Sequence, residues 1–191
     1  MPLQTGRTMS PRFIRTERLI LRPWALADVA SVFAYAVDHE WARFLPVPHP
    51  YSEADAHQFV ATQMSLDWQE QFGWAMEHDG RAIGGINLRF FSEGLIAEID
   101  YAVARTYWRR GLATEAAVAV VDTAFQSFPK LTRVRSMVDA RNLASARVLE
   151  KIGMKREGVL RSNSFERGEA IDEAWYGLLR REWEDQRQSR R

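Results

Sequence analysis

Hydrophobic residues in the first third of the chain recur first with the spacing of a strand and then with that of helices. The apolar stretch at residues 18–24 predicts a short strand that Pro23 closes. Apolar side chains then return every three or four positions over residues 26–37, which predicts an amphipathic helix. Ser52 and Asp55 form an S-x-x-D start for a second helix. We therefore expect two helices after the first strand, with a proline-rich segment between them.

From Gly73 onward the hydrophobic period becomes that of strands joined by tight turns. Asp79-Gly80 and Glu93-Gly94 are turn sequences. The runs that these turns separate are residues 73–78, 81–91 and 95–103. Strands joined by such short turns pair with their neighbours, so this segment predicts a three-stranded antiparallel meander.

The pattern then returns to helical spacing, and a strand–helix–strand unit begins at residue 95. Pro129 terminates the predicted helix. One apolar stripe runs along it, formed by Ala117, Val120, Val121, Ala124, Phe125 and Phe128. Residues 133–138 then predict the second strand of the unit.

The C-terminal part of the chain predicts one more helix and a closing hairpin. Asn142 is placed to cap a helix over residues 143–152, and Gly153 is placed to stop it in a left-handed conformation. Arg167-Gly168 is a turn sequence, which predicts a hairpin whose last strand is residues 173–179. The sequence after this strand carries charges of both signs, so we expect it to end in solvent.

Length and composition are those of a single domain. A chain of 191 residues that is 46% hydrophobic can bury one core and is short for two full domains. We expect a mobile arm at residues 1–12, one domain at residues 13–183 and a charged tail at residues 184–191. The 26 basic and 25 acidic residues leave a net charge of +1, so the cationic excess that drives nucleic-acid binding is missing.

Several kinds of site and location are disfavoured by what the sequence lacks. It contains no cysteine, which excludes disulfides, thiolate metal sites and a cysteine nucleophile. It has no G-x-S-x-G elbow of a serine hydrolase, and its histidines lack H-x-x-x-H spacing, so we expect no bound metal. The four histidines are His39, His49, His57 and His78. The N-terminal residues do not form a secretory signal, and no run approaches the roughly 20 apolar residues that span a bilayer. We expect a soluble cytoplasmic protein with no membrane partner.

The turn from Trp108 to Thr114 carries the strongest chemical signal. It leads from a strand into a helix, and Gly111 and Ala113 keep it small enough for a ligand to approach the backbone. The unpaired N–H groups of a helix start bind phosphate well. The turn is neither a Walker loop nor a dinucleotide fingerprint. A phosphate site is therefore one interpretation, and a plain helix entry solvated by two arginines is the other.

Three polar side chains are candidates for chemistry. Glu98 and Asp100 lie two apart on a predicted strand and so share one face, either exposed to solvent or directed at a cationic partner. Ser145 precedes Val148 and Leu149 by three and four residues, which places its hydroxyl on the packed face of its helix. A small residue chosen for close packing is the alternative explanation for Ser145.

Several ordered motifs resemble those of one enzyme family. They are "TERLILRPW", "AEIDYAV", "YWRRGLATEA", "ARNLASARVLEKIGM" and "EGVLR". Over about residues 13–180 they resemble the GNAT superfamily of acyl-CoA-dependent N-acetyltransferases, and within it the RimJ/RimL-like branch of ribosomal-protein N-terminal acetyltransferases. The resemblance implies a single mixed α/β (α+β) domain. Its central twisted sheet would be mostly antiparallel, with one splayed parallel strand pair and about four flanking helices.

The resemblance also implies a binding site for acetyl-CoA and no metal. The family's phosphate loop is Q/R-x-x-G-x-G/A, and here Trp108 stands where Gln or Arg is usual, as in similar sequences of this branch. The resemblance assigns the pyrophosphate mainly to main-chain atoms of Arg109, Arg110, Gly111, Leu112, Ala113 and Thr114. It further assigns Tyr101 and Val103, on the strand that splays, to cofactor binding. Asn142 is assigned to the pantetheine arm and can cap its helix at the same time.

Catalytic and acceptor-binding roles follow from the same resemblance. Glu98 is assigned as the general base that removes a proton from the acceptor ammonium, with Asp100 as helper or substitute. Ser145 is assigned as a proton donor to the departing thiolate. The acceptor pocket is expected to be rimmed by Trp41, Phe44 and Leu45.

The expected reaction is direct transfer of an acetyl group from acetyl-CoA to a primary amine, without a covalent enzyme intermediate. Positioning of the two reactants and a backbone N–H near the thioester oxygen would supply much of the catalysis. The acceptor is either a small-molecule amine or a protein N-terminus, and the protein is a monomer or a homodimer. The alternative function is a catalytically weak acyl-CoA-binding sensor or partner-binding module. An RNA-associated factor has little support from a net charge of +1.

Overall fold

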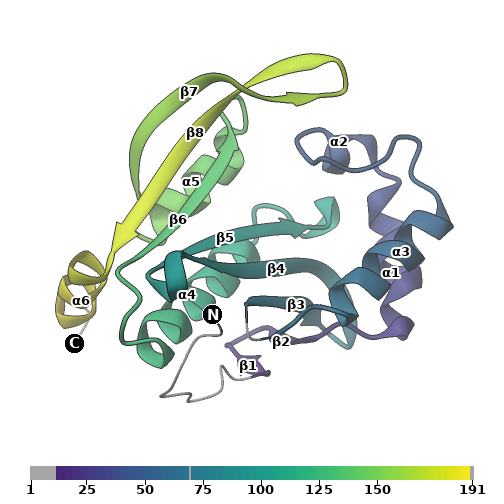
Figure 1. Ribbon diagram of the computed structural model, residues 1–191. Helices are drawn as coiled ribbons and strands as arrows, with labels where there is room; N and C mark the ends of the chain where they lie inside the picture. The colour runs from purple at the N-terminus through teal and green to yellow at the C-terminus, as the bar shows by residue number, and fades with distance from the viewer. Residues whose placement is uncertain (1–11, 69, 190–191) are drawn as a thin grey trace.

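The computed structural model describes residues 12–68 and 70–189, and its centre is one eight-stranded sheet (Figure 1). The spatial order of the strands is β1-β2-β3-β4-β5-β6-β8-β7. Their bounds are β1 Ile14–Arg15, β2 Ile20–Pro23, β3 Gln71–His78, β4 Arg81–Phe91, β5 Ile96–Val103, β6 Arg133–Asp139, β7 Lys155–Glu166 and β8 Glu169–Leu179. All neighbouring strands are antiparallel except β5 and β6. The predicted meander and the predicted parallel pair are both confirmed.

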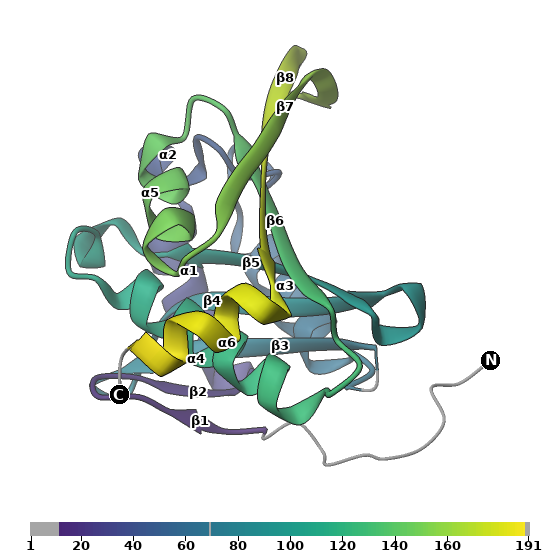
Figure 2. The ribbon, with the colours of Figure 1, turned by 90° about the vertical axis from the view of Figure 1, so that its left-hand side faces the viewer.

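Helices cover both faces of this sheet. They are α1 Val29–Ala36, α2 His39–Ala42, α3 Glu53–Met64, α4 Leu112–Ser127, α5 Leu143–Lys151 and α6 Arg180–Ser189. The main core lies between the sheet and α4, with α5 joining it through Leu149. A smaller core holds α1 and α3 against the opposite face. Figure 2 shows the β7–β8 hairpin rising above the rest of the sheet.

The helix boundaries follow from the capping residues that the sequence predicts. The Ser52 hydroxyl accepts a hydrogen bond from the Asp55 N–H at 3.2 Å, and the Asp55 carboxylate accepts one from the Ser52 N–H at 2.8 Å. Asn142 Oδ1 accepts from the Ser145 N–H at 3.1 Å and so caps α5. Gly153 follows α5 with φ of 92°, a left-handed conformation that favours glycine.

The C-terminal segment, for which we expected a charged tail, is helical as far as Ser189. It forms α6, in which the buried Trp183 stacks on Phe125 of α4 with ring centroids 5.1 Å apart. Trp183 Nε1 also donates a hydrogen bond to Asp122. The helix crosses the boundary at residue 184 where a tail was expected, because one aromatic anchor attaches an otherwise charged segment. The expected N-terminal arm lies outside the described residues except for Arg12.

The parallel pair separates soon after it forms. β5 and β6 pair only where Ile96–Glu98 lies beside Arg133–Arg135, although β5 continues to Val103 and β6 to Asp139. Beyond this point β5 is paired on one side only, with β4. The second half of β5 therefore has main-chain groups on its β6 side that the sheet does not use.

Candidate active site

The start of α4 offers unpaired donors beside open space. The first main-chain hydrogen bond at this end of α4 runs from the Glu115 N–H to the Gly111 carbonyl at 2.9 Å. The N–H groups of the three preceding residues therefore have no acceptor within the helix. Gly111 has φ of 78°, and among the described residues a side chain added there would meet only Arg18, at 3.5 Å. A ligand phosphate can therefore reach these donors.

Side chains around the loop fix its shape without filling it. Trp108 Nε1 donates to the Val103 carbonyl at 2.7 Å, so the tryptophan that replaces the usual Gln or Arg fastens the loop to the end of β5. Arg109 is exposed with a positive φ of 61°. The exposed Arg110 guanidinium lies over the Tyr107 ring, 5.2 Å from its centroid. The loop therefore presents two cations to solvent beside the helix start.

Beyond Glu98, β5 and β6 separate, and we call this separation the splay. Alternate residues of β5 direct their main-chain N–H and C=O groups toward it. Ser136 Oγ donates to the Ile99 carbonyl at 2.8 Å from β6, and Trp108 binds the Val103 carbonyl on the same side. Because N–H and C=O directions alternate along a strand, Tyr101 directs its main-chain groups to that side too. No hydrogen bond joins them to β6 within the described part of the chain. These groups are free to bind an extended ligand.

Glu98 forms an ion pair with Arg135, a residue that the sequence analysis did not predict for the site. Its carboxylate accepts a hydrogen bond from Arg135 Nε at 2.9 Å. The Arg135 guanidinium lies between two rings, 4.8 Å from the Phe91 centroid and 5.1 Å from the Trp175 centroid. This arrangement joins β4, β5, β6 and β8 on one face. It holds the Glu98 charge in an ion pair where the strands are still paired.

Asp100 lies on the same face but beyond Glu98, the last residue of β5 that pairs with β6. Asn87 Nδ2 on β4 donates to its carboxylate at 2.7 Å. The side chain is exposed at the sheet surface, yet surrounding protein desolvates it enough to raise the pKa of Asp100. The hydrogen bond from Asn87 and the charge of Arg89 oppose this shift, while Glu98 adds to it. Asp100 has no ion pair within the described residues.

Ser145 and Tyr101 form a hydroxyl pair on the opposite face. The Ser145 hydroxyl donates to the Tyr101 oxygen at 3.2 Å, and the Tyr101 hydroxyl donates to the Ser145 carbonyl at 3.0 Å. Burial raises the pKa of Tyr101 above its ordinary value, so its proton is retained at neutral pH. Asn142 uses its side-chain oxygen as the cap of the same helix. Two proton donors thus lie beside the splay, across the strand from Asp100.

The expected acceptor rim lies close to Asp100 along β5. Ala102, the next residue on the same face, packs against a cluster around the buried Trp41 and the partly buried Leu45. Trp41 is 9% exposed, so little of its side chain is open to a ligand. Phe44 lies under the Arg43 guanidinium, 5.0 Å from its ring centroid. The structure thus brings Trp41 and Leu45 to the face that holds Asp100.

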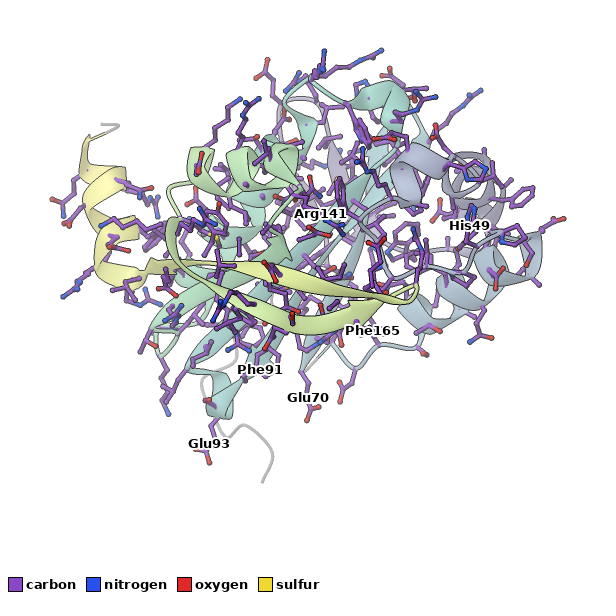
Figure 3. All side chains as sticks on the ribbon, turned by 90° about the horizontal axis from the view of Figure 1, so that it is seen from above. His49, Glu70, Phe91, Glu93, Arg141 and Phe165 are labelled. Carbon is purple, nitrogen blue, oxygen red and sulfur yellow. The ribbon has the colours of Figure 1, made fainter. Side chains whose placement is uncertain are left out.

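The β7–β8 hairpin is attached to this rim. Arg167 at its tip donates from Nη2 to the Ala42 carbonyl at 2.7 Å and to the Leu45 carbonyl at 2.8 Å. Arg141 also pairs with Glu169 of the hairpin at 3.2 Å. Figure 1 shows the hairpin reaching toward α2, and Figure 3 looks down on it, with Phe165 near its tip.

Asn87 and Arg135, which contact the two carboxylates, were not predicted as site residues. The position of Asn87 can nevertheless be predicted from the register of the β4–β5 hairpin. The β4–β5 hairpin turns at Glu93-Gly94 and pairs Phe91 with Ile96. Counting back along both strands places Asn87 opposite Asp100, as the structure does. No local pattern marks Arg135, because its partner belongs to a strand 37 residues earlier.

The described residues were also searched for a metal site and for a helix that could cross a membrane. They contain no group of three or more His, Cys, Asp or Glu side chains arranged to hold a metal ion. None of their helices has the length and the apolar composition that a membrane crossing requires.

Comparison with known proteins identifies the family. The family model described as "Acetyltransferase (GNAT) domain" matches residues 18–155. The chain is 31% identical over 171 residues to the uncharacterized N-acetyltransferase YnaD of Bacillus subtilis, covering 89% of this chain and 98% of YnaD. An acetyltransferase (GNAT family) from Bacillus anthracis superposes with a TM-score of 0.79 at 29% identity, covering 88% of this chain and 99% of that one.

A more distant structure shares the fold. RimL, a ribosomal L7/L12 α-N-protein acetyltransferase solved with coenzyme A, superposes with a TM-score of 0.76 at 15% identity, covering 87% of this chain and 97% of RimL. The protein described here belongs to the GNAT acetyltransferase family.

Proposed function

We propose that this protein transfers an acetyl group from acetyl-CoA directly to a primary amine, with Asp100 as the general base. The observation that carries the proposal is the splay of β5 from β6. A carboxylate that makes no ion pair with another described residue lies on one face of β5, and two hydroxyl donors lie on the other. The site thus has a group that accepts a proton and groups that donate one, on either side of a single strand.

Acetyl-CoA fits the start of α4 and the free edge of β5. The N–H groups of Leu112, Ala113 and Thr114, with the open approach at Gly111, would hold the pyrophosphate. The Tyr101 carbonyl and the Val103 N–H on the β6 side would pair with the amides of the pantetheine arm. The acetyl thioester is thereby supplied to the interval between the two strands.

The acceptor amine must lose a proton before it can attack. Asp100 takes a proton from the ammonium, directly or through water, and the amine nitrogen then bonds to the thioester carbonyl carbon. The carbon–sulfur bond breaks as the nitrogen loses its second proton, which leaves the amide. The thiolate receives a proton from Tyr101 or Ser145, and the second proton from the nitrogen restores that hydroxyl through water. A main-chain N–H at Tyr101 would stabilise the charge that develops on the carbonyl oxygen. Glu98 supports this face through Arg135 and is the weaker candidate for the base.

The acceptor is proposed at a coarser level. A protein N-terminus or a small-molecule amine would enter from the Asp100 face, beside Ala102 and the Trp41 cluster. The likeness in fold to RimL, a ribosomal L7/L12 α-N-protein acetyltransferase, supports testing N-terminal peptides first. We place the reaction in the cytoplasm, where acetyl-CoA and such amines meet.

Replacement of Gly111 tests the position of the cofactor. Acetyl-CoA at a hundredfold excess over its dissociation constant would stabilise the native protein by about 2.7 kcal/mol and raise its melting temperature. Gly111→Val would abolish this shift, since a side chain would enter the phosphate's approach and strain the positive φ. Gly168→Val, at the exposed hairpin turn with φ of 85°, is the matched control for backbone strain. Equal shifts for wild type and Gly111→Val would place the pyrophosphate elsewhere.

A further inference from the structure

The turn between β1 and β2 is fastened to the start of α4. Glu115 lies in the first turn of α4, 97 residues after Arg18. One of its carboxylate oxygens accepts from Thr16 Oγ1 at 2.6 Å and from the Arg18 N–H at 2.8 Å. The other accepts a hydrogen bond from Arg18 Nε at 2.7 Å and forms an ion pair with Arg18 Nη2 at 2.6 Å. Three hydrogen bonds and one ion-pair contact from a single turn thus converge on one carboxylate.

These bonds cancel a charge that would oppose the binding of phosphate. A carboxylate in the first turn of α4 repels an anion bound at the same helix start. Burial pushes the pKa of Glu115 upward, but the bonds from Thr16 and Arg18 outweigh this and hold the pKa below its usual value. Glu115 is therefore ionised at neutral pH, and Arg18 supplies the matching positive charge.

The Arg18 guanidinium also borders the phosphate loop. Its Nη1 donates to the Arg110 carbonyl at 2.9 Å, and its Nη2 faces the open space at Gly111. A guanidinium has five N–H groups, and the contacts to Glu115 and Arg110 use three of them. Two N–H groups, one on each terminal nitrogen, remain available. The Arg18 side chain is 42% exposed, so a ligand can reach them.

We propose that Arg18 binds a phosphate oxygen of coenzyme A from outside the loop, held in position by Thr16 and Glu115. The inference rests on the proposed site of the pyrophosphate at Gly111. The planar guanidinium suits this role because one edge is fixed by a carboxylate while other N–H groups point elsewhere. The turn between β1 and β2 thus forms part of the proposed cofactor site.

A donor without phosphates separates this role from a structural one. S-acetylpantetheine has the same thioester and the same pantetheine arm as acetyl-CoA and carries no phosphate. Arg18→Ala should lower kcat/KM for acetyl-CoA by about 10- to 100-fold, mainly through KM, because a charge-assisted hydrogen bond is lost. The same variant should lower kcat/KM for S-acetylpantetheine by a much smaller factor. Equal losses with the two donors would overturn the proposal.

Arg15→Ala is the matched control. Arg15 lies on β1, three residues before Arg18, and its exposed side chain makes no hydrogen bond or ion pair with another described residue. Its replacement should change kcat/KM for either donor by no more than about twofold, as expected for an exposed charge. A loss as large as that of Arg18→Ala would show a general effect of surface charge and would overturn the proposal.

The double variant Arg18→Ala/Glu115→Gln shows whether Arg18 binds the phosphate itself or only cancels the negative charge of Glu115. If Arg18 only cancels the charge of Glu115, removal of both charges restores the wild-type KM for acetyl-CoA, and the proposal is wrong. If Arg18 binds phosphate, KM stays at least about fivefold above wild type. Binding of acetyl-CoA to Gly111→Val tests the position of the pyrophosphate separately from the role of Arg18. Loss of acetyl-CoA binding in Gly111→Val but not in Arg18→Ala rejects only the role of Arg18, whereas retention in Gly111→Val rejects both.

Discussion

At the scale of single residues, the neighbours of a carboxylate decide whether it is available as a base. Glu98 and Asp100 share one face of β5 and are separated by one residue. Glu98 is held by Arg135, which is itself enclosed by two aromatic rings. Asp100 has an amide partner and a raised pKa. Of the two carboxylates, Asp100 is therefore the one that we propose as the general base.

Replacement of each carboxylate tests this assignment. Asp100→Asn should lower kcat by about 100- to 10,000-fold, the contribution of a general base, and leave acetyl-CoA affinity nearly unchanged. Glu98→Gln should lower kcat less, because it leaves the base in place. Steady-state kinetics with one good acceptor, together with binding of acetyl-CoA, measure both effects. A larger loss of kcat in Glu98→Gln would assign the base to Glu98 instead.

The pH profile gives the same assignment a second readout. Because Asp100 accepts a proton only when ionised, kcat/KM should rise with pH through the raised pKa of Asp100. The hydrogen bond from Asn87 lowers that pKa, so Asn87→Ala should move the rising limb to higher pH. A limb that stays in place in Asn87→Ala, or that persists in Asp100→Asn, would contradict the role of Asp100.

At the scale of elements, the sequence predicts well what local chemistry fixes. The caps of α3 and α5 and the turns of the meander follow from side chains within a few residues of each boundary. The one-turn helix α2 is too short to show a hydrophobic period, and α6 reads as charged sequence. Both depend on contacts with distant parts of the chain.

The candidate site shows the same limit. The loop before α4 could be predicted from its own sequence, while the Arg18–Glu115 and Tyr101–Ser145 contacts could not, because they join residues far apart in the chain.

The attachment of the β7–β8 hairpin to α2 gives a prediction at this scale. Arg167→Ala removes two hydrogen bonds to main-chain carbonyls that lie beside the acceptor rim. We expect KM for the acceptor to rise about fivefold or more, with KM for acetyl-CoA unchanged, because the rim loses one support. Initial rates measured while each substrate is varied in turn will check this. The control is Arg161→Ala, which replaces an exposed arginine on β7, away from the turn that holds Arg167. An equal rise in both KM values would contradict a role confined to the acceptor side.

At the scale of the whole molecule, one sheet separates the two halves of the reaction. The cofactor loop and the hydroxyl pair lie toward α4 and α5, while Asp100 and the Trp41 cluster lie on the other face. Only at the splay can groups from both faces reach one reacting centre. In the proposed mechanism, this geometry lets an acyl donor and a proton acceptor act on one reacting centre. It leaves the identity of the amine to side chains at the rim.

Release of coenzyme A in the presence of amines tests the central claim most directly. The wild-type protein should be assayed for thiol release from acetyl-CoA across N-terminal peptides, amino acids and polyamines, with acetylated product quantified by mass spectrometry. Transfer predicts that thiol release depends on an amine and equals the acetylated amine formed. If acetyl-CoA binds and raises the melting temperature, yet no amine increases thiol release above hydrolysis, the protein is an acyl-CoA-binding module and the proposed transfer is wrong.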